Sequence, residues 1–160
     1  MEDTGKYSSP ILAKYLWAYG NERGYYMNMT KVQKLLFISY GLFLAWRNCR
    51  LVDEHPQAWP YGPVFPTTRN KLLKVNLDKL KREDSEFDSC RTDDDLERLL
   101  ASVFKRFGGF TANQLVDWTH MDNSPWDKTR MKDGFKWGER IQDEVICDYF
   151  KSNLLNPNLA

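Results

Sequence analysis

The stretch from Val32 to Trp46 constrains the fold most, because it is apolar on nearly all of its faces. Its apolar side chains recur at helical spacing, at Val32, Leu35, Leu36, Ile38, Tyr40, Leu42, Phe43, Leu44 and Trp46. A helix that is hydrophobic all round is buried by its neighbours. The sequence therefore predicts a central helix enclosed by the other elements. Thr30 and Gln33 precede it with the spacing of a capping box, in which both side chains bond to backbone amides at the helix start.

Further helix signals follow one another along the chain. A serine cap followed by proline marks helix starts at Ser9-Pro10 and Ser124-Pro125. A second capping-box pattern marks the start at Thr111 with Gln114, and caps with acidic residues after them mark the starts at Thr92 and Asp143. Gly108-Gly109 is a helix stop, and another helical stretch follows Pro66 to about Lys74. We expect a mainly α, single compact domain of six or seven helices over residues 9–151, with flexible segments at 1–8 and 152–160.

The segment from Asn48 to Pro66 breaks this helical pattern. It contains Pro56, Pro60, Pro63 and Pro66, and proline at this density excludes helix. Short extended pieces at Leu51-Val52 and Gln57–Trp59 could pair with each other. We therefore expect either a short β-hairpin or an extended proline-rich loop here.

Composition excludes several classes of protein. The 160 residues suit one domain, and 23 basic against 22 acidic residues give a formal net charge of only +1, which does not favour nucleic-acid binding. Three widely spaced cysteines fit reduced thiols, the first residues carry no apolar targeting stretch, and no apolar run approaches the length of a membrane span. The sequence predicts a cytoplasmic protein with no membrane segment.

Charge is nevertheless divided within the chain. Residues 69–82 contain six basic side chains and one acidic, a net charge of +5, and residues 83–97 contain eight acidic side chains and one basic, a net charge of −7. A solvated connector with acids at a helix start is the simplest interpretation. The basic segment leaves open an alternative, a regulatory nucleic-acid or peptide-binding module.

The sequence offers no catalytic or metal-binding constellation. His120 with Asp122 could orient a general base, but no local nucleophile motif accompanies it, and a helix-terminal histidine bonded to backbone is the simpler interpretation. His55 beside Asp53 and Glu54 lacks the paired ligands of a zinc motif. Gly108-Gly109 lacks the spacing of a phosphate-binding loop. We therefore predict a protein that is not an enzyme and needs no metal or cofactor.

Aromatic residues are abundant and one group is unusually placed. The chain has nine Phe, eight Tyr and six Trp, and three of these rings, Trp59, Tyr61 and Phe65, lie in one proline-rich loop. A stiff loop presents aromatic side chains at low entropic cost, as binding hot spots do, although a loop that folds its rings into the domain is an equal alternative. For the pair Trp118 and Trp126, packing in the core is favoured.

Ordered motifs resemble a known family. They comprise Lys31-Val32-Gln33-Lys34-Leu35-Leu36-Phe37, Gly41, Leu44-Ala45, Ala58-Trp59, Tyr61-Gly62-Pro63-Val64, Leu115, Thr119-His120, Pro125-Trp126 and Tyr149-Phe150. This set, running from Met29 to Phe150, resembles the Panacea domain, a family also described as SocA-like and phage-associated. Pro60 departs from it, because the family often has a charged or polar residue there, and residues 69–91 match no family pattern.

The resemblance implies a mainly helical antitoxin domain that neutralises a toxin encoded beside it by direct protein contact. One family member is thought to deliver its toxin to a AAA+ protease, which makes such a protease a second candidate partner. We expect the toxin-binding surface to be shaped or formed by Trp59, Tyr61, Gly62, Pro63, Val64 and Phe65. We expect a structural role for Gln33, Lys34, His120, Pro125 and Trp126. The terminal Asn158-Leu159-Ala160 resembles a bacterial protease tag, with an ordinary chain end as the alternative.

Overall fold

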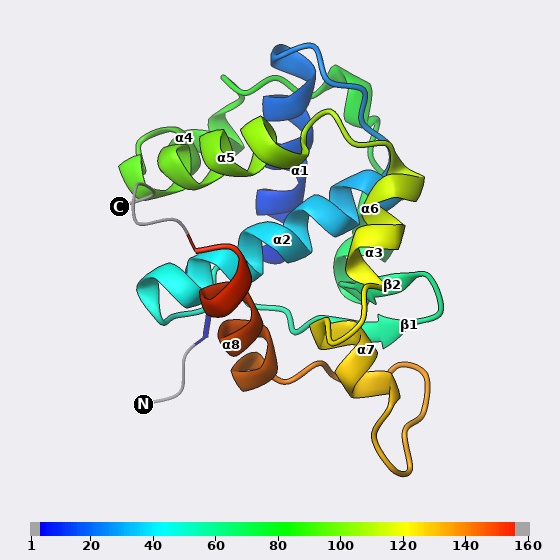
Figure 1. Ribbon diagram of the computed structural model, residues 1–160. Coiled ribbons are helices and arrows are strands. Elements are labelled where there is room, and N and C mark those ends of the chain that lie inside the picture. Colours follow the sequence, from blue (N-terminus) through cyan, green and yellow to red (C-terminus); the bar gives the residue numbers. More distant parts are fainter. Residues whose placement is uncertain (1–3, 156–160) are drawn as a thin grey trace.

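Helix α2 (Met29–Arg47) crosses the middle of the structure, and the other elements are arranged around it (Figure 1). The computed structural model describes residues 4–155. Every residue from Lys31 to Ala45 is buried, which confirms the prediction of a central buried helix. Because α2 is covered on all sides, its few polar side chains must find their partners inside the protein.

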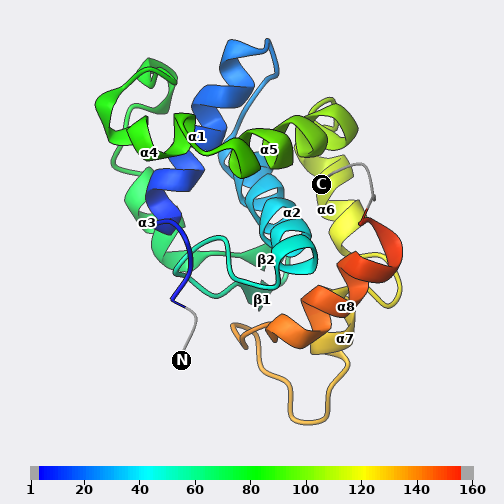
Figure 2. The same cartoon turned by 90° about the vertical axis from the view of Figure 1, so that its left-hand side faces the viewer.

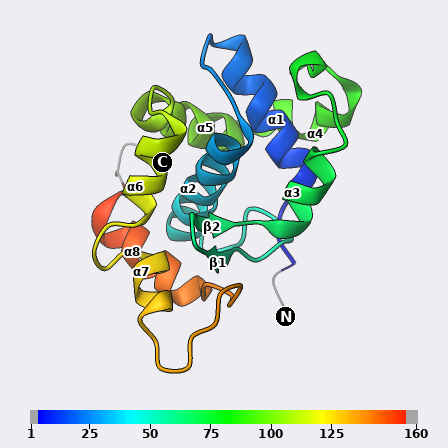
Figure 3. The same ribbon diagram turned by 90° about the vertical axis from the view of Figure 1, so that its right-hand side faces the viewer.

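The remaining helices cover α2 from opposite sides. Helices α1 (Ser9–Glu22) and α3 (Pro66–Leu72) lie on one side, whereas α6 (Ala112–Thr119), α7 (Pro125–Arg130) and α8 (Asp143–Asn153) lie on the other (Figures 2 and 3). Helix α5 (Asp94–Phe107) packs across α2, and the short α4 (Asp88–Arg91) leads into it. Between α3 and α4 the chain forms two 3₁₀ turns, η1 (Leu77–Lys79) and η2 (Ser85–Phe87). The mainly α fold is as predicted, although the described residues form eight α-helices, since the short α4 was not predicted.

Helix α8 packs closely against α2. A Cβ atom added at Gly41 would lie 2.3 Å from the ring of Phe150, so only glycine leaves room for that ring. The C-terminal part of α8 includes residues 152 and 153 and is followed by the buried Leu154, so this part of the predicted tail belongs to the domain. The tag-like Asn158-Leu159-Ala160 lies outside the described residues.

A small hairpin closes one end of the helical array. Strand β1 (Gln57–Trp59) pairs with the antiparallel β2 (Gly62–Val64), with Trp59 opposite Gly62, so Pro60 and Tyr61 form the turn. Of the two predicted outcomes the hairpin is therefore correct, but its partner strand was predicted wrongly. Val52 instead pairs with Tyr7, whose N–H donates to the Leu51 carbonyl over 2.9 Å. This bridge holds Tyr7, part of the segment expected to be flexible, against the domain.

A third segment borders the hairpin. The Ala58 N–H donates to the Glu139 carbonyl, and the Gly138 N–H donates to the Ala58 carbonyl, both over 2.8 Å. These bonds occupy the outer edge of β1 and tie down the base of the projecting loop 131–140 (orange in Figure 1).

Helix starts follow the predicted signals in part. The capping box of Thr111 and Gln114 is present, and Ser124 caps α7 by accepting the Asp127 N–H. Elsewhere the cap differs by a residue or two. Asp93, not Thr92, caps α5, and Asn28, not Thr30, caps α2 by accepting the Lys31 N–H over 2.8 Å. A carboxylate or amide oxygen competes well with a threonine hydroxyl for this role.

Two further starts also move by one position. Helix α1 begins at Ser9, which was predicted as its cap, and the Ser9 N–H donates to the Asp53 carboxylate over 2.9 Å. Helix α8 begins at Asp143, and its cap residue is Gln142. No helix in the part of the chain that the structure describes is long and apolar enough to cross a membrane.

Candidate functional site

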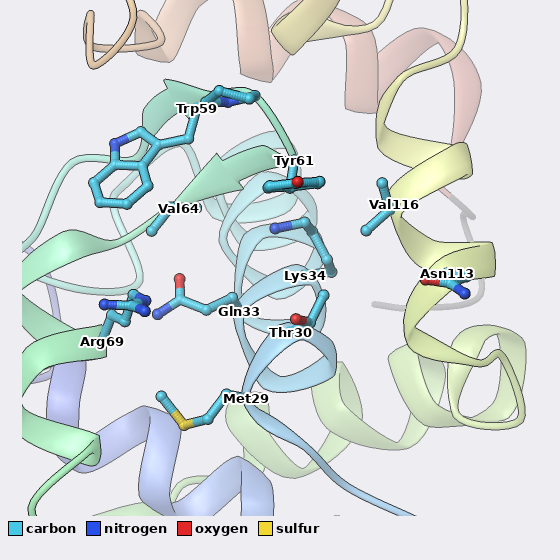
Figure 4. A pocket seen from close by; sticks show the side chains of 11 residues that line it. Met29, Thr30, Gln33, Lys34, Trp59, Tyr61, Val64, Arg69, Asn113 and Val116 are labelled. Atoms are coloured by element: carbon cyan, nitrogen blue, oxygen red, sulfur yellow. The ribbon is translucent and has the colours of Figure 1, made fainter.

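A pocket of about 650 Å³ lies where the hairpin meets α2, α3 and α6 (Figure 4). Helix α2 contributes Met29, Thr30, Gln33 and Lys34. The hairpin contributes Trp59, Pro60, Tyr61 and Val64. Arg69 of α3 borders one side, and Asn113 and Val116 of α6 border the opposite side (Figure 4). Apolar walls with a few polar groups are typical of a binding pocket.

Gln33 fixes the end of β2. Its side-chain Nε2 donates to the Phe65 carbonyl over 3.2 Å, and its Oε1 accepts the Phe65 N–H over 2.8 Å. These backbone groups have left the strand and are buried, where an unpaired N–H or C=O would be costly. The amide of Gln33 therefore pairs with the backbone N–H and carbonyl of Phe65 in place of a neighbouring strand.

Lys34 fixes the middle of β2 in the same way. Its Nζ donates to the Pro63 carbonyl over 2.9 Å, and the whole residue is only 2% exposed. Burial lowers the pKa of Lys34 to about 8, because the charged ammonium has lost its water. Among the described residues no carboxylate forms an ion pair with it. The pocket thus contains a buried ammonium group, that of Lys34, which donates to the Pro63 carbonyl.

Gly62 seats the turn against this cluster. Its φ of +111° lies in the region that side-chain-bearing residues rarely adopt. A Cβ atom there would lie 2.8 Å from Thr119 Oγ1 and 2.9 Å from Lys34 Cε. Both the conformation and the close approach therefore require glycine at this position.

The Thr119-His120 and Pro125-Trp126 motifs meet behind the hairpin. The His120 and Trp126 rings stack with centroids 3.8 Å apart, and Trp126 Nε1 donates to the Trp59 carbonyl over 2.7 Å. Ser124, just before Pro125, donates to the Thr119 carbonyl over 2.8 Å. Burial, together with the nearby Lys34 and Arg130 charges, lowers the pKa of His120. This favours a neutral imidazole stacked on the indole.

The predicted binding residues of the loop have different environments. Tyr61 is 77% exposed at the tip of the turn, and Trp59 is partly buried with its Nε1 donating to Gln57. Pro63 and Val64 are buried in β2. Phe65 is completely buried and packs edge-on against Tyr40, with ring centroids 5.7 Å apart, so it is not an exposed anchor. The proline that follows it starts α3.

Five pocket residues were not singled out from the sequence: Met29, Thr30, Arg69, Asn113 and Val116. Arg69 was placed only within the basic segment 69–82. It is exposed, and no ion pair or hydrogen bond involves its guanidinium in residues 4–155. Of these five side chains only Thr30 belongs to a local motif, the capping-box pattern with Gln33, and that pattern does not point to a pocket. Met29 and Thr30 lie at the start of α2, whereas α3 brings Arg69 and α6 brings Asn113 and Val116 to the hairpin.

The pocket has the chemistry of a binding site. Its lining supplies positive charge from Lys34 and Arg69 and no carboxylate. In the described part of the chain no group of three or more His, Cys, Asp or Glu side chains could hold a metal ion. The arrangement offers hydrogen-bond donors and aromatic surface to a ligand.

Comparisons with known proteins identify the family. The family model described as antitoxin SocA-like, Panacea domain, matches residues 32–127, which include Gln33, Lys34, the hairpin and Trp126. The chain is also 30% identical over 131 residues to antitoxin SocA of Caulobacter vibrioides (strain NA1000 / CB15N), covering 75% of this chain and 70% of that protein. No solved structure matches the chain. Membership supports an antitoxin role, implies a cognate toxin as partner and suggests a non-catalytic regulatory protein. The chain belongs to the SocA-like antitoxin family that is defined by the Panacea domain.

Proposed function

We propose that this antitoxin neutralises its cognate toxin by binding it directly, through Tyr61, Trp59 and the pocket beside them. The observation that carries the proposal is the exposure of Tyr61 on a turn whose two sides are fixed. The carbonyls of Pro63 and Trp59 are bonded to Lys34 and Trp126. An aromatic side chain held in advance loses little entropy when a partner binds. The roles proposed for Gly62, Pro63, Val64 and Phe65 are to shape this turn.

The other predicted residues complete the support. Gln33 and Lys34 bond to the β2 side of the hairpin. Trp126, which follows Pro125 in the first turn of α7 and stacks on His120, bonds to the β1 side. We therefore assign these five residues a positioning role, which Gln33 and Lys34 combine with a place in the wall of the pocket.

The alternative function, recognition of nucleic acid by residues 69–82, receives less support. Arg82 is paired with Glu22 over 2.7 Å, and Arg69 faces the pocket on the hairpin side of α3. Two of the six basic residues are therefore engaged elsewhere, which leaves the exposed Lys71, Lys74, Lys79 and Lys81 for such a surface. A nucleic-acid complex would also weaken steeply with salt, whereas an aromatic-anchored protein complex would not.

The proposal is tested by co-expressing the antitoxin with the product of the adjacent gene. The neighbour alone should arrest growth, the wild-type antitoxin should restore it, and the two should co-purify. Tyr61→Ala should weaken the complex by about 10-fold or more, as removal of a hot-spot aromatic does. Tyr26→Ala is a matched control, because Tyr26 is also 77% exposed but does not line the pocket.

Three outcomes would contradict the proposal. An innocuous neighbour or the absence of a complex would remove direct neutralisation. Equal binding by Tyr61→Ala and Tyr26→Ala would remove this surface. Rescue of growth that requires a AAA+ protease, with a shortened toxin half-life, would show delivery to degradation in place of inhibition by binding alone.

A further inference from the structure

We propose that the pocket binds an extended segment of the toxin in which an acidic side chain lies next to a bulky apolar one. This inference rests on the proposed function, because it names the chemistry of the toxin segment that the same surface would recognise. Arg69 and Lys34 would receive the carboxylate, and the aromatic wall would receive the apolar side chain.

The charge of the pocket is the first argument. None of the residues that line it is acidic, although the chain as a whole has almost as many acidic as basic residues. Lys34 is buried with a carbonyl as its assigned partner, and buried charges in proteins are normally paired. A carboxylate from the partner would supply the missing counter-charge.

Arg69 is the second argument, because its unpaired guanidinium borders the pocket, whereas other arginines are paired or lie elsewhere on the surface. Arg82 pairs with Glu22, Arg47 with Asp95 and Arg130 with Asp127. Within residues 4–155 four exposed arginines form no ion pair, Arg69, Arg98, Arg106 and Arg140, and of these only Arg69 borders the pocket, from α3 (Figure 4). A guanidinium without an internal partner is available for bidentate contact with a carboxylate.

The shape of the site indicates how the segment would bind. A toxin strand cannot pair with either edge of the hairpin. Residues 138–141 already bond to the edge of β1, and on the β2 side Lys34 bonds to the Pro63 carbonyl and Gln33 to the Phe65 backbone. Recognition must therefore come from side chains entering the pocket. A volume of about 650 Å³ is large enough for more than one side chain.

The apolar part of the pocket lies beside the charges. Trp59, Val64 and Val116 are partly or fully buried in its walls, and the exposed Tyr61 stands at its rim. Arg69, Asn113 and Tyr61 are all exposed, so the pocket is open on both flanks of the hairpin. A chain can pass across it without ending in it, and we therefore commit to an internal Asp or Glu side chain as the occupant.

The test uses the purified full-length antitoxin and the toxin from the adjacent gene, with dissociation constants measured by calorimetry. Arg69→Glu should weaken the complex by about 30-fold, because it places a carboxylate against a carboxylate. Lys71→Glu is the matched control, since it changes the net charge equally from an exposed position on the same helix outside the pocket. It should change the dissociation constant by less than about 3-fold, as expected of a rim charge.

A charge exchange then identifies the occupant. Each exposed Asp and Glu of the toxin is replaced by Lys in turn and titrated with the Arg69→Glu antitoxin. Restoration of at least about 10-fold in affinity at one position, flanked by an apolar residue, would establish the proposed contact.

The remaining outcomes overturn the inference in distinguishable ways. If wild type binds and Arg69→Glu behaves like Lys71→Glu, the pocket does not recognise an acid, while direct neutralisation stands. If only a C-terminal extension of the toxin weakens binding, the occupant is a chain end and the internal side chain is excluded. If wild type forms no complex, the proposed function fails and the inference fails with it.

Discussion

Two segments of this protein share a local pattern and use it differently, one at the start of α2 and one at the start of α6. In α6, Thr111 accepts the Gln114 N–H over 3.1 Å, and Gln114 returns a bond to the Thr111 N–H over 2.8 Å. In α2, Thr30 makes no such bond, Asn28 caps the helix, and Gln33 reaches across to Phe65. The same residues at the same spacing therefore form a cap in one helix and a support for the hairpin in the other.

The difference follows from what surrounds each glutamine. Gln114 is exposed, so the nearby backbone amide is the best partner that it has. Gln33 is buried next to a hairpin whose backbone groups lack a neighbouring strand, and satisfying these groups is worth more than a surface bond. Gln33 thus departs from the capping-box pattern because its side chain bonds to a distant part of the chain.

Removing the Gln33 amide should have the largest effect. Gln33→Ala would leave the Phe65 N–H and carbonyl buried and unpaired, which should lower the free energy of unfolding by about 2–5 kcal/mol. Urea denaturation followed by circular dichroism measures this loss. A loss below about 1 kcal/mol would mean that water replaces the amide and that Gln33 is not the support we describe.

The neighbouring Lys34 should give stability a specific dependence on pH. Its pKa is about 8 in the folded protein, whereas an unfolded lysine titrates near 10.4, so between these values the unfolded state holds a proton that the folded state has lost. The Lys34 contribution to stability therefore rises with pH in this window, by about 1.4 kcal/mol per pH unit at most. Below pH 8 both states are protonated and the full cost of burying the charge remains.

The measurement is the difference in unfolding free energy between wild type and Lys34→Met at pH 7, 8, 9 and 10. The contributions of the other titrating groups are the same in both proteins and cancel. The unfolding free energy of wild type relative to Lys34→Met should therefore increase by about 2 kcal/mol between pH 7 and 10. A difference that is flat over this range would show that Lys34 keeps its usual pKa and is hydrated. If wild type instead became less stable relative to Lys34→Met as the pH rises, burial would not be what lowers the pKa of Lys34.

The two candidate caps of α2, Asn28 and Thr30, should differ by a smaller amount in their effect on stability. Asn28→Ala removes the oxygen that accepts the Lys31 N–H and should destabilise the protein by about 1 kcal/mol. Thr30→Ala should change stability by less than about 0.5 kcal/mol, because the exposed Thr30 makes no capping bond. Thermal unfolding of the two variants side by side checks this order. Equal losses, or a larger loss for Thr30→Ala, would restore the cap that the sequence pattern predicted.

The sequence allowed correct prediction wherever a local signal had no competitor. The buried helix α2, the capping box of α6 and the Ser124 cap of α7 all depend on residues a few positions apart. The pairing of Val52 with Tyr7 and the use of Gln33 depend on residues that are distant in the chain and could not be obtained from periodicity. For the three rings of the proline-rich loop the sequence left exposure and burial equally open, because proline content indicates stiffness and carries no information on which way a side chain points. Phe65 is buried whereas Tyr61 is exposed.

The site was predictable to a similar limit. The motifs around Lys34, Gly62 and Trp126 were recognised as a set, and the structure brings them together within one hairpin support. The partners that complete the pocket, Arg69 and Val116, come from α3 and α6 and carry no motif. Their approach is set by how the helices pack on α2.

The smallest effect should come from Gln114, the counterpart of Gln33. Gln114→Ala removes one bond of the α6 capping box, at an exposed position where water can take its place, and should cost about 0.5 kcal/mol. The same urea denaturation as for Gln33→Ala measures it, so that the two glutamines are compared under one condition. A Gln114→Ala loss as large as that of Gln33→Ala would show that burial is not what distinguishes them.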